Sequence, residues 1–169
     1  MDGSSDQGDE LVDELDAMGN PSGVVSRREV RAGNLWHRSV LIAVVNDADE
    51  LLVHRRAAWK DVWPDVWDIA VGGVVGAGEA WEAAAARELA EETGVTAELG
   101  YLGEGEYADA DVREIARVYH ARTDGPFSFD DGEIVEAAWV PLRQVRQWLT
   151  DKAVCPDSVA LVLPRLDAP

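Results

Sequence analysis

Apolar residues in the middle of the chain fall in short runs rich in β-branched side chains, and turn-forming residues separate these runs. Two of them, Arg38–Asn46 and Leu51–Arg56, flank the turn NDADE and predict a hairpin of buried strands. A shorter run, DIAVGG at 68–73, predicts a strand that ends in a diglycine turn. Further strands are predicted at 95–103, 113–122 and 134–140.

Helical spacing of apolar residues occurs in three places. The longest stretch, Glu79–Thr93, ends before Gly94, and glycine favours the left-handed conformation that follows a helix. Pro141–Leu149 starts with a proline, which suits the first helical position, and 153–166 is expected to form a short third helix. The elements do not alternate regularly, so we expect an α/β (α+β) domain in which a mixed sheet lies between helices.

The first twenty residues differ in composition from the rest. Residues 1–20 hold seven acidic residues and no basic ones, with glycine and serine between them. We expect an acidic, mobile tail there, with a short helix over Glu10–Met18. The composition changes at Pro21, and a chain of 169 residues suffices for one domain with a sizeable core. The predicted domain therefore covers 21–169.

The formal net charge of −18 limits the partners of the protein. Such a field repels nucleic acid and anionic membranes, so we expect neither a nucleic-acid polymer nor a membrane as a partner. Lysine occurs only at Lys60 and Lys152, while Arg27, Arg28 and Arg31 form a basic patch after the acidic tail. A phosphorylated substrate would need metal ions or local arginines to offset the repulsion.

No targeting signal is recognised in the sequence. The N-terminus is acidic where a secretory signal would be basic, and no apolar run reaches the ~20 residues that span a bilayer. Cys155 is the single cysteine, which excludes an internal disulfide and a cysteine-based zinc site. We expect a cytoplasmic protein.

Three glutamates lie on one side of the longest predicted helix. Glu88, Glu91 and Glu92 fall within about 80° of one another at 100° per residue. Like charges at this spacing repel, so either solvent screens them or a cation belongs there. The opposite side carries residues that would let the helix approach a sheet closely, namely Ala83, Ala86, Leu89 and Ala90. We expect the acidic face to point away from the sheet.

A glycine-rich segment, VGGVVGAGE at 71–79, leads into this helix. Its glycines let the backbone approach a ligand and present N–H groups to it. Three carboxylates at spacing i, i+3, i+4 are suitable oxygen ligands for Mg²⁺ or Mn²⁺, and Mg²⁺ prefers carboxylates together with phosphate oxygens. The combination predicts chemistry on a diphosphate.

The segment Gly73–Val95 resembles the Nudix box at every defined position, with Glu79 after five residues and RELAEETGV after seven more. The resemblance implies the Nudix fold, an α/β/α sandwich with a central mixed sheet. It also implies that Glu88, Glu91 and Glu92 hold one to three divalent cations, Mg²⁺ or Mn²⁺.

The same resemblance implies a reaction. Nudix enzymes hydrolyse a nucleoside diphosphate linked to another group: metal ions neutralise the diphosphate and acidify an attacking water, and a carboxylate takes its proton. The base varies within the family, and Glu91, Glu133 and Glu114 are the candidates here. Glu79 and Arg87 are expected to brace the loop against the helix.

A narrower resemblance covers 35–46 and 51–68 as well as the box. These segments are similar to the Nudix branch that contains isopentenyl-diphosphate isomerases, in which an arginine and a lysine contact the substrate diphosphate. That resemblance implies Arg56 and Lys60, together with Gly73 of the box, as substrate-binding residues.

The isomerase reaction needs a cysteine just before the box glycine and a histidine just after it, and this chain has Gly72 and Val74 there. We therefore interpret the protein as a hydrolase on an isomerase-like framework that acts on a small-molecule diphosphate. An isomerase-like protein and a Nudix domain that binds a ligand without turnover stay as alternatives. No motif identifies the substrate, and a homodimer is common among relatives.

Overall fold

The computed structural model describes residues 7–166, and within this part seven strands form one mixed sheet. β3 (Trp36–Val45) pairs in parallel with β8 (Arg113–Arg122) and antiparallel with β6 (Val71–Val74). The predicted hairpin of β3 with β4 (Glu50–Arg56) exists, but these two strands pair only Val45 with Leu51, beside the turn. The remaining strands of the sheet are β5 (Trp67–Asp68), β7 (Leu99–Ala108) and β9 (Ile134–Pro141).

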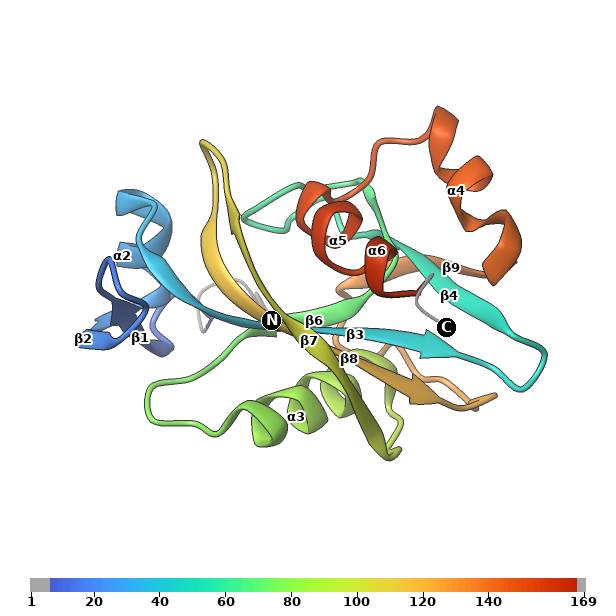
Figure 1. Ribbon diagram of the computed structural model, residues 1–169, viewed down its shortest axis with the longest axis horizontal. Helices are drawn as coiled ribbons and strands as arrows, with labels where there is room; N and C mark the ends of the chain where they lie inside the picture. Colours follow the sequence, from blue (N-terminus) through green and yellow to red (C-terminus); the bar gives the residue numbers. More distant parts are fainter. Residues whose placement is uncertain (1–6, 167–169) are drawn as a thin grey trace.

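Helices cover both faces of this sheet (Figure 1). α3 (Trp81–Thr93) lies on one face and begins two residues later than the sequence predicts. The other face is covered by five short helical segments near the C-terminus, namely η1 (Leu142–Gln144), α4 (Val145–Trp148), η2 (Leu149–Asp151), α5 (Pro156–Leu161) and α6 (Leu163–Leu166). The structure is therefore the predicted α/β/α sandwich. A bilayer crossing needs a longer and more apolar helix than any found between residues 7 and 166.

Side chains of β3 alternate between the two cores of the sandwich, as the period of two in a strand requires. Leu41 packs in the core beneath the C-terminal helices, together with Val162. Ile42 packs in the core beneath α3, together with Leu89. The apolar run of β3 is continuous because both of its faces are buried.

The N-terminal segment forms a hairpin and not the predicted helix. β1 (Leu11–Leu15) pairs antiparallel with β2 (Pro21–Ser26), so the helix expected over Glu10–Met18 is wrong. Val12 explains the difference, because its buried side chain packs against Val74 of β6, a long-range contact that local spacing does not reveal. The predicted tail over 1–20 thus includes one strand of a hairpin, and residues 1–6 lie outside the described part of the chain.

The helix α3 packs through a different face from the predicted one. Among the residues expected to face the sheet only Leu89 is buried, and the exposed ones are Ala83, Ala86 and Ala90. Glu88 and Glu92 are buried as well, so part of the acidic face turns toward the sheet. β6 leaves space for the Glu88 carboxylate because Gly73 has no side chain, and the N–H of Gly72 donates to Oε1 of Glu92.

A short helix, α2 (Arg27–Gly33), follows the hairpin and is tied to the loop after β4. The Oδ2 atom of Asp61 in that loop lies 3.4 Å from Nε of Arg27 and 3.1 Å from Nε of Arg31. Burial raises the pKa of Asp61, but the two arginines lower it more, to about 2. Asp61 therefore stays ionised and holds α2 against the loop.

We expect Asp61→Asn to destabilise the protein at neutral pH and not in acid. The folded-state pKa of Asp61 lies below the usual 3.8, so its contribution is present in full above pH 4 and is lost as the pH falls toward 2. Urea denaturation of both proteins should show free energies of unfolding that differ at pH 6 and converge between pH 4 and pH 2. A difference that stays constant over that range would contradict the assignment.

Candidate active site

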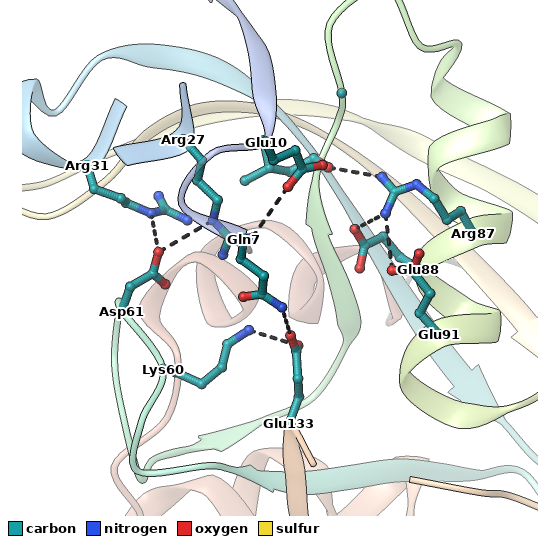
Figure 2. A network of polar contacts seen from close by, with 12 residues as sticks. Gln7, Glu10, Arg27, Arg31, Lys60, Asp61, Arg87, Glu88, Glu91 and Glu133 are labelled. Atoms are coloured by element: carbon teal, nitrogen blue, oxygen red, sulfur yellow. Dashed lines mark hydrogen bonds and ion pairs between the residues drawn. The ribbon is translucent and has the colours of Figure 1, made fainter. Parts of the chain in front are cut away.

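A cleft of about 380 Å³ opens between α3, the glycines of β6 and the segment before β9 (Figure 2). The predicted site residues that line it are Lys60, Gly73, Arg87, Glu88, Glu91 and Glu133. Glu92 adjoins it, because Oε1 of Glu92 accepts a hydrogen bond of 3.3 Å from the N–H of Gly72. Arg56 and Glu114 do not line this cleft.

The carboxylate of Glu88 occupies the space that a side chain at position 73 would take. A Cβ atom at position 73 would lie 2.7 Å from the carboxylate carbon of Glu88. Glu88 is 9% exposed, and its Oε1 accepts a hydrogen bond of 2.7 Å from Nη1 of Arg87. Burial nevertheless raises the pKa of Glu88 to about 7; Arg87 opposes this shift, and the charges of Glu91 and Glu133 add to it.

Glu91 and Glu92 differ sharply in environment. Glu92 is 5% exposed, and burial, followed by the charges of neighbouring carboxylates, raises its pKa well above the usual range. The side chain of Glu91 is 55% exposed and accepts a hydrogen bond of 3.3 Å from Nη1 of Arg87. The box thus presents two buried carboxyl groups and one that faces solvent.

Arg87 joins the helix to the loop that precedes it. Its Nε and Nη2 atoms donate to the two carboxylate oxygens of Glu79 at 2.9 and 3.0 Å, a bidentate arrangement. Nη2 also lies 3.3 Å from the carbonyl oxygen of Val74, and Glu79 accepts the N–H of Gly76 at 2.8 Å. This is the brace between loop and helix that the resemblance implied.

The chemistry of the cleft fits a divalent cation, although its carboxylates are not gathered as ligands. Between residues 7 and 166, no three histidine, cysteine, aspartate or glutamate side chains converge around a point that a metal ion could take. Glu88 and Glu91 instead share the guanidinium of Arg87. Buried carboxyl groups that repel one another are the groups that a hard cation stabilises. Glu88, Glu91 and Glu92 are thus the residues that could hold Mg²⁺ or Mn²⁺.

Glu133 lies on the opposite side of the cleft, between two hydrogen-bond donors (Figure 2). Nζ of Lys60 is 2.8 Å from its Oε2, and Nε2 of Gln7 donates to its Oε1 at 2.6 Å. Burial raises the pKa of Glu133, but the charge of Lys60 and these hydrogen bonds lower it more, so the net shift is downward. Lys60 and Glu133, predicted separately as site residues, form one buried ion pair.

Arg56 and Glu114 line a second, inner cavity of about 70 Å³, which shares four lining residues with the cleft: Arg27, Lys60, Gly72 and Gly73. Arg56 donates to the carbonyl oxygens of two residues of the loop after β4, at 3.2 and 3.0 Å, and thereby fixes that loop. Glu114 is 4% exposed beside Asp157, and burial raises the pKa of both carboxyl groups. Glu114 is therefore separated from the box carboxylates that line the cleft.

The cleft also contains residues that the sequence did not single out as site residues: Gln7, Glu10, Arg27 and Asp131. Arg27 belongs to the basic patch, the one signal in the sequence that could have drawn attention to it. Gln7 and Glu10 lie in the segment that was expected to be a tail, and the hairpin contacts that bring them to the cleft are not local.

The structure leaves no space for the isomerase cysteine. A Cβ atom at Gly72 would lie 1.9 Å from the carbonyl oxygen of Val40 on the neighbouring strand β3. Val74, at the position of the isomerase histidine, is a buried core residue.

Comparisons with known proteins agree with this geometry. The model of the NUDIX domain family matches residues 35–158. An uncharacterized Nudix hydrolase of Pseudomonas aeruginosa is 36% identical over 160 residues, which cover 94% of this chain and 95% of that protein.

Solved structures share the fold. A Deinococcus radiodurans protein superposes with a TM-score of 0.77 at 24% identity and covers 94% of this chain and 100% of its own. The NUDIX domain of Shewanella oneidensis NrtR, solved in complex with ADP ribose, has a TM-score of 0.60 at 19% identity, over 75% of this chain and 83% of its own. With a family match over most of its length, a complete box and a close relative of equal extent, this chain belongs to the Nudix family and is a Nudix hydrolase, an enzyme that acts on pyrophosphate bonds.

Proposed function

We propose that this enzyme cleaves the diphosphate linkage of a nucleoside diphosphate joined to another group, with Mg²⁺ or Mn²⁺ as its cofactor. The observation that carries this proposal is the pair of buried carboxyl groups, Glu88 and Glu92, whose charge nothing nearby offsets fully. Glu88, Glu91 and Glu92 would hold the cation. When bound, a divalent cation offsets negative charge on a diphosphate and acidifies water.

The proton acceptor is assigned by comparing the three candidate carboxylates. Both oxygens of Glu133 already accept hydrogen bonds, and its lowered pKa makes it a weaker base. Glu114 lines the inner cavity and not the cleft. Glu91 lines the cleft and is exposed to solvent. Glu91 is therefore the residue that takes the proton of the attacking water, while Glu133 holds Lys60.

The substrate would be bound by Lys60 and by the backbone of Gly73, both of which line the cleft. Lys60 points into the cleft toward Glu133, and the backbone of Gly73 lies beside it without side-chain cover. Arg56 acts indirectly, since it positions the loop that carries Lys60. The ligand is a small diphosphate, as is the ADP ribose bound by the NrtR domain. The cytoplasmic location and the homodimer stay predictions.

Two other functions are less well supported. An isomerase would need a thiol at position 72, where a side chain would meet the backbone of β3. A domain that only binds its ligand would have no need of Glu91, Glu88 and Glu92 together.

Incubation of the protein with a panel of diphosphates, with Mg²⁺ or with Mn²⁺, tests the proposal. The panel should include ADP ribose, nucleoside diphosphate sugars and isopentenyl diphosphate. We expect release of a nucleoside monophosphate from at least one member, and no release with excess chelator. Isomerisation of isopentenyl diphosphate would favour the isomerase, and tight binding of one compound without cleavage would favour the ligand-binding domain.

Glu91→Gln and Glu92→Gln should each lower turnover by several orders of magnitude, because each removes a charge that the cation or the proton transfer needs. Steady-state kinetics on the best substrate of the panel measures the effect. Glu98→Gln, an exposed change just beyond α3, is the matched control and should leave turnover unchanged. Activity near that of the wild type in both box variants would refute the assignment.

The two glycines of β6 should respond differently to alanine. Gly72→Ala places a Cβ atom against backbone and should cost about 1–3 kcal/mol of stability. In Gly73→Ala the nearest atoms to the new Cβ belong to the Glu88 carboxylate, so we expect a fold that stays close to the wild type in melting temperature and a turnover reduced by about tenfold or more. Equal losses of stability in both variants would show that position 73 serves the fold and not the site.

A further inference from the structure

Arg27 is a buried cation whose hydrogen-bonding capacity is almost unused. It is 9% exposed, and its side chain donates no hydrogen bond to any group within residues 7–166. Its Nε lies 3.4 Å from Asp61 and its Nη1 lies 3.8 Å from Glu10, both beyond good hydrogen-bond length. A guanidinium carries five donors, so a buried one with this few contacts can still receive an anion.

The position of Arg27 makes that capacity accessible. Its side chain lines both the cleft and the inner cavity, across from the carboxylates of α3. The other cations of the cleft have close partners: Lys60 contacts Glu133 at 2.8 Å, and Arg87 is bidentate on Glu79. Arg27 is thus the cation of the cleft that holds its partners most loosely.

Glu10 is the carboxylate that lies nearest to the cleft side of Arg27 (Figure 2). Its side chain is 32% exposed and, within the described residues, forms no hydrogen bond. Burial raises the pKa of Glu10; Arg27 and Arg87 oppose this shift, and Glu79 and Glu91 add to it. The carboxylate is therefore held by weak attraction and is subject to repulsion from the box.

The backbone of Glu10, in contrast, is fixed. Its carbonyl oxygen accepts the N–H of Arg27 at 2.8 Å, and the next residue, Leu11, accepts the N–H of Ala77 at 2.8 Å. The buried side chain of Val12 anchors the same strand in the domain. The Glu10 side chain can rotate away from Arg27 while the hairpin stays in place.

We propose that Arg27 binds a phosphate oxygen of the substrate, and that the Glu10 carboxylate occupies this anion position until the substrate displaces it. The inference rests on the proposed diphosphate substrate. A diphosphate oxygen would form charge-assisted hydrogen bonds with the fork of Arg27, which the more distant Glu10 does not. Glu10 therefore acts as an internal competitor: it offsets a buried charge in the free protein and raises the substrate concentration needed for binding.

The test measures binding of inorganic pyrophosphate to the full chain by calorimetry, with excess chelator so that no metal contributes. Glu10→Gln should tighten binding about two- to fivefold, the range for a weak, partly exposed ion pair. Arg27→Met should weaken it about tenfold or more, and Arg27→Lys should recover part of that loss. Glu14→Gln on the same hairpin and Arg28→Met on the same helix are matched controls and should leave binding unchanged.

The kinetic counterpart uses the best substrate of the panel. Glu10→Gln should lower KM by a similar factor with kcat unchanged, which a merely structural role for Glu10 would not produce. Thermal unfolding checks that each variant is folded, and if Arg27→Met is not, Arg27→Lys and Glu10→Gln carry the test. Wild-type pyrophosphate affinity in folded Glu10→Gln and Arg27→Lys would overturn the inference even if hydrolysis is confirmed. If the pyrophosphate affinities of these variants shift as expected but no panel member is hydrolysed, the role of Arg27 as an anion-binding residue is supported and only the proposed reaction is refuted.

Discussion

The contact between α3 and the glycine pair of β6 is the constraint on which the site depends. Without a side chain at Gly73, the helix can turn Glu88 inward beside the strand, and the N–H of Gly72 donates a hydrogen bond to the buried Glu92. Burial then opposes ionisation of both carboxyl groups, and neighbouring carboxylates raise their pKa further: Glu91 and Glu133 act on Glu88, and Glu133 and Glu88 act on Glu92. The same absence of side chains leaves the cleft open above the strand. The packing of α3 against the glycines of β6 thus supplies both the space of the cleft and a group of carboxylates that a cation would stabilise.

Electrostatics explains how a chain of net charge −18 can present a site to an anionic ligand. Arg27, Lys60 and Arg87 line one cleft together with five carboxylates, Glu10, Glu88, Glu91, Asp131 and Glu133. Each lies near a carboxylate in the free protein, so the buried charges are offset before a ligand arrives. The strength of these pairs differs: the bidentate pair of Arg87 is structural, while the 3.8 Å contact of Arg27 with Glu10 is weak enough to exchange.

The sequence predicted most of the sandwich because the apolar runs of its strands and the box helix are strong local patterns. It also predicted from their spacing that Glu88, Glu91 and Glu92 act together, and Glu88 and Glu91 line the cleft. The predicted orientation of α3 is wrong. Its small residues favoured Ala83 and Ala86 as the packing face, whereas the space left by Gly73 on the separate strand β6 lets Glu88 face the sheet. The hairpin of β1 was missed for a similar reason, since Val12 is buried by residues far away in the chain. Because the hairpin was not predicted, the positions of Gln7 and Glu10 in the cleft were not predicted either.

The account depends on the box carboxylates of the free enzyme forming a cation site. Titration of metal-free protein with Mn²⁺ and Mg²⁺, followed by calorimetry and by thermal unfolding without substrate, tests this most directly. The account predicts saturable binding and a melting temperature that rises with metal concentration, because the cation offsets the repulsion among Glu88, Glu91 and Glu92. Metal-independent stability, together with full hydrolytic activity in excess chelator, would contradict it.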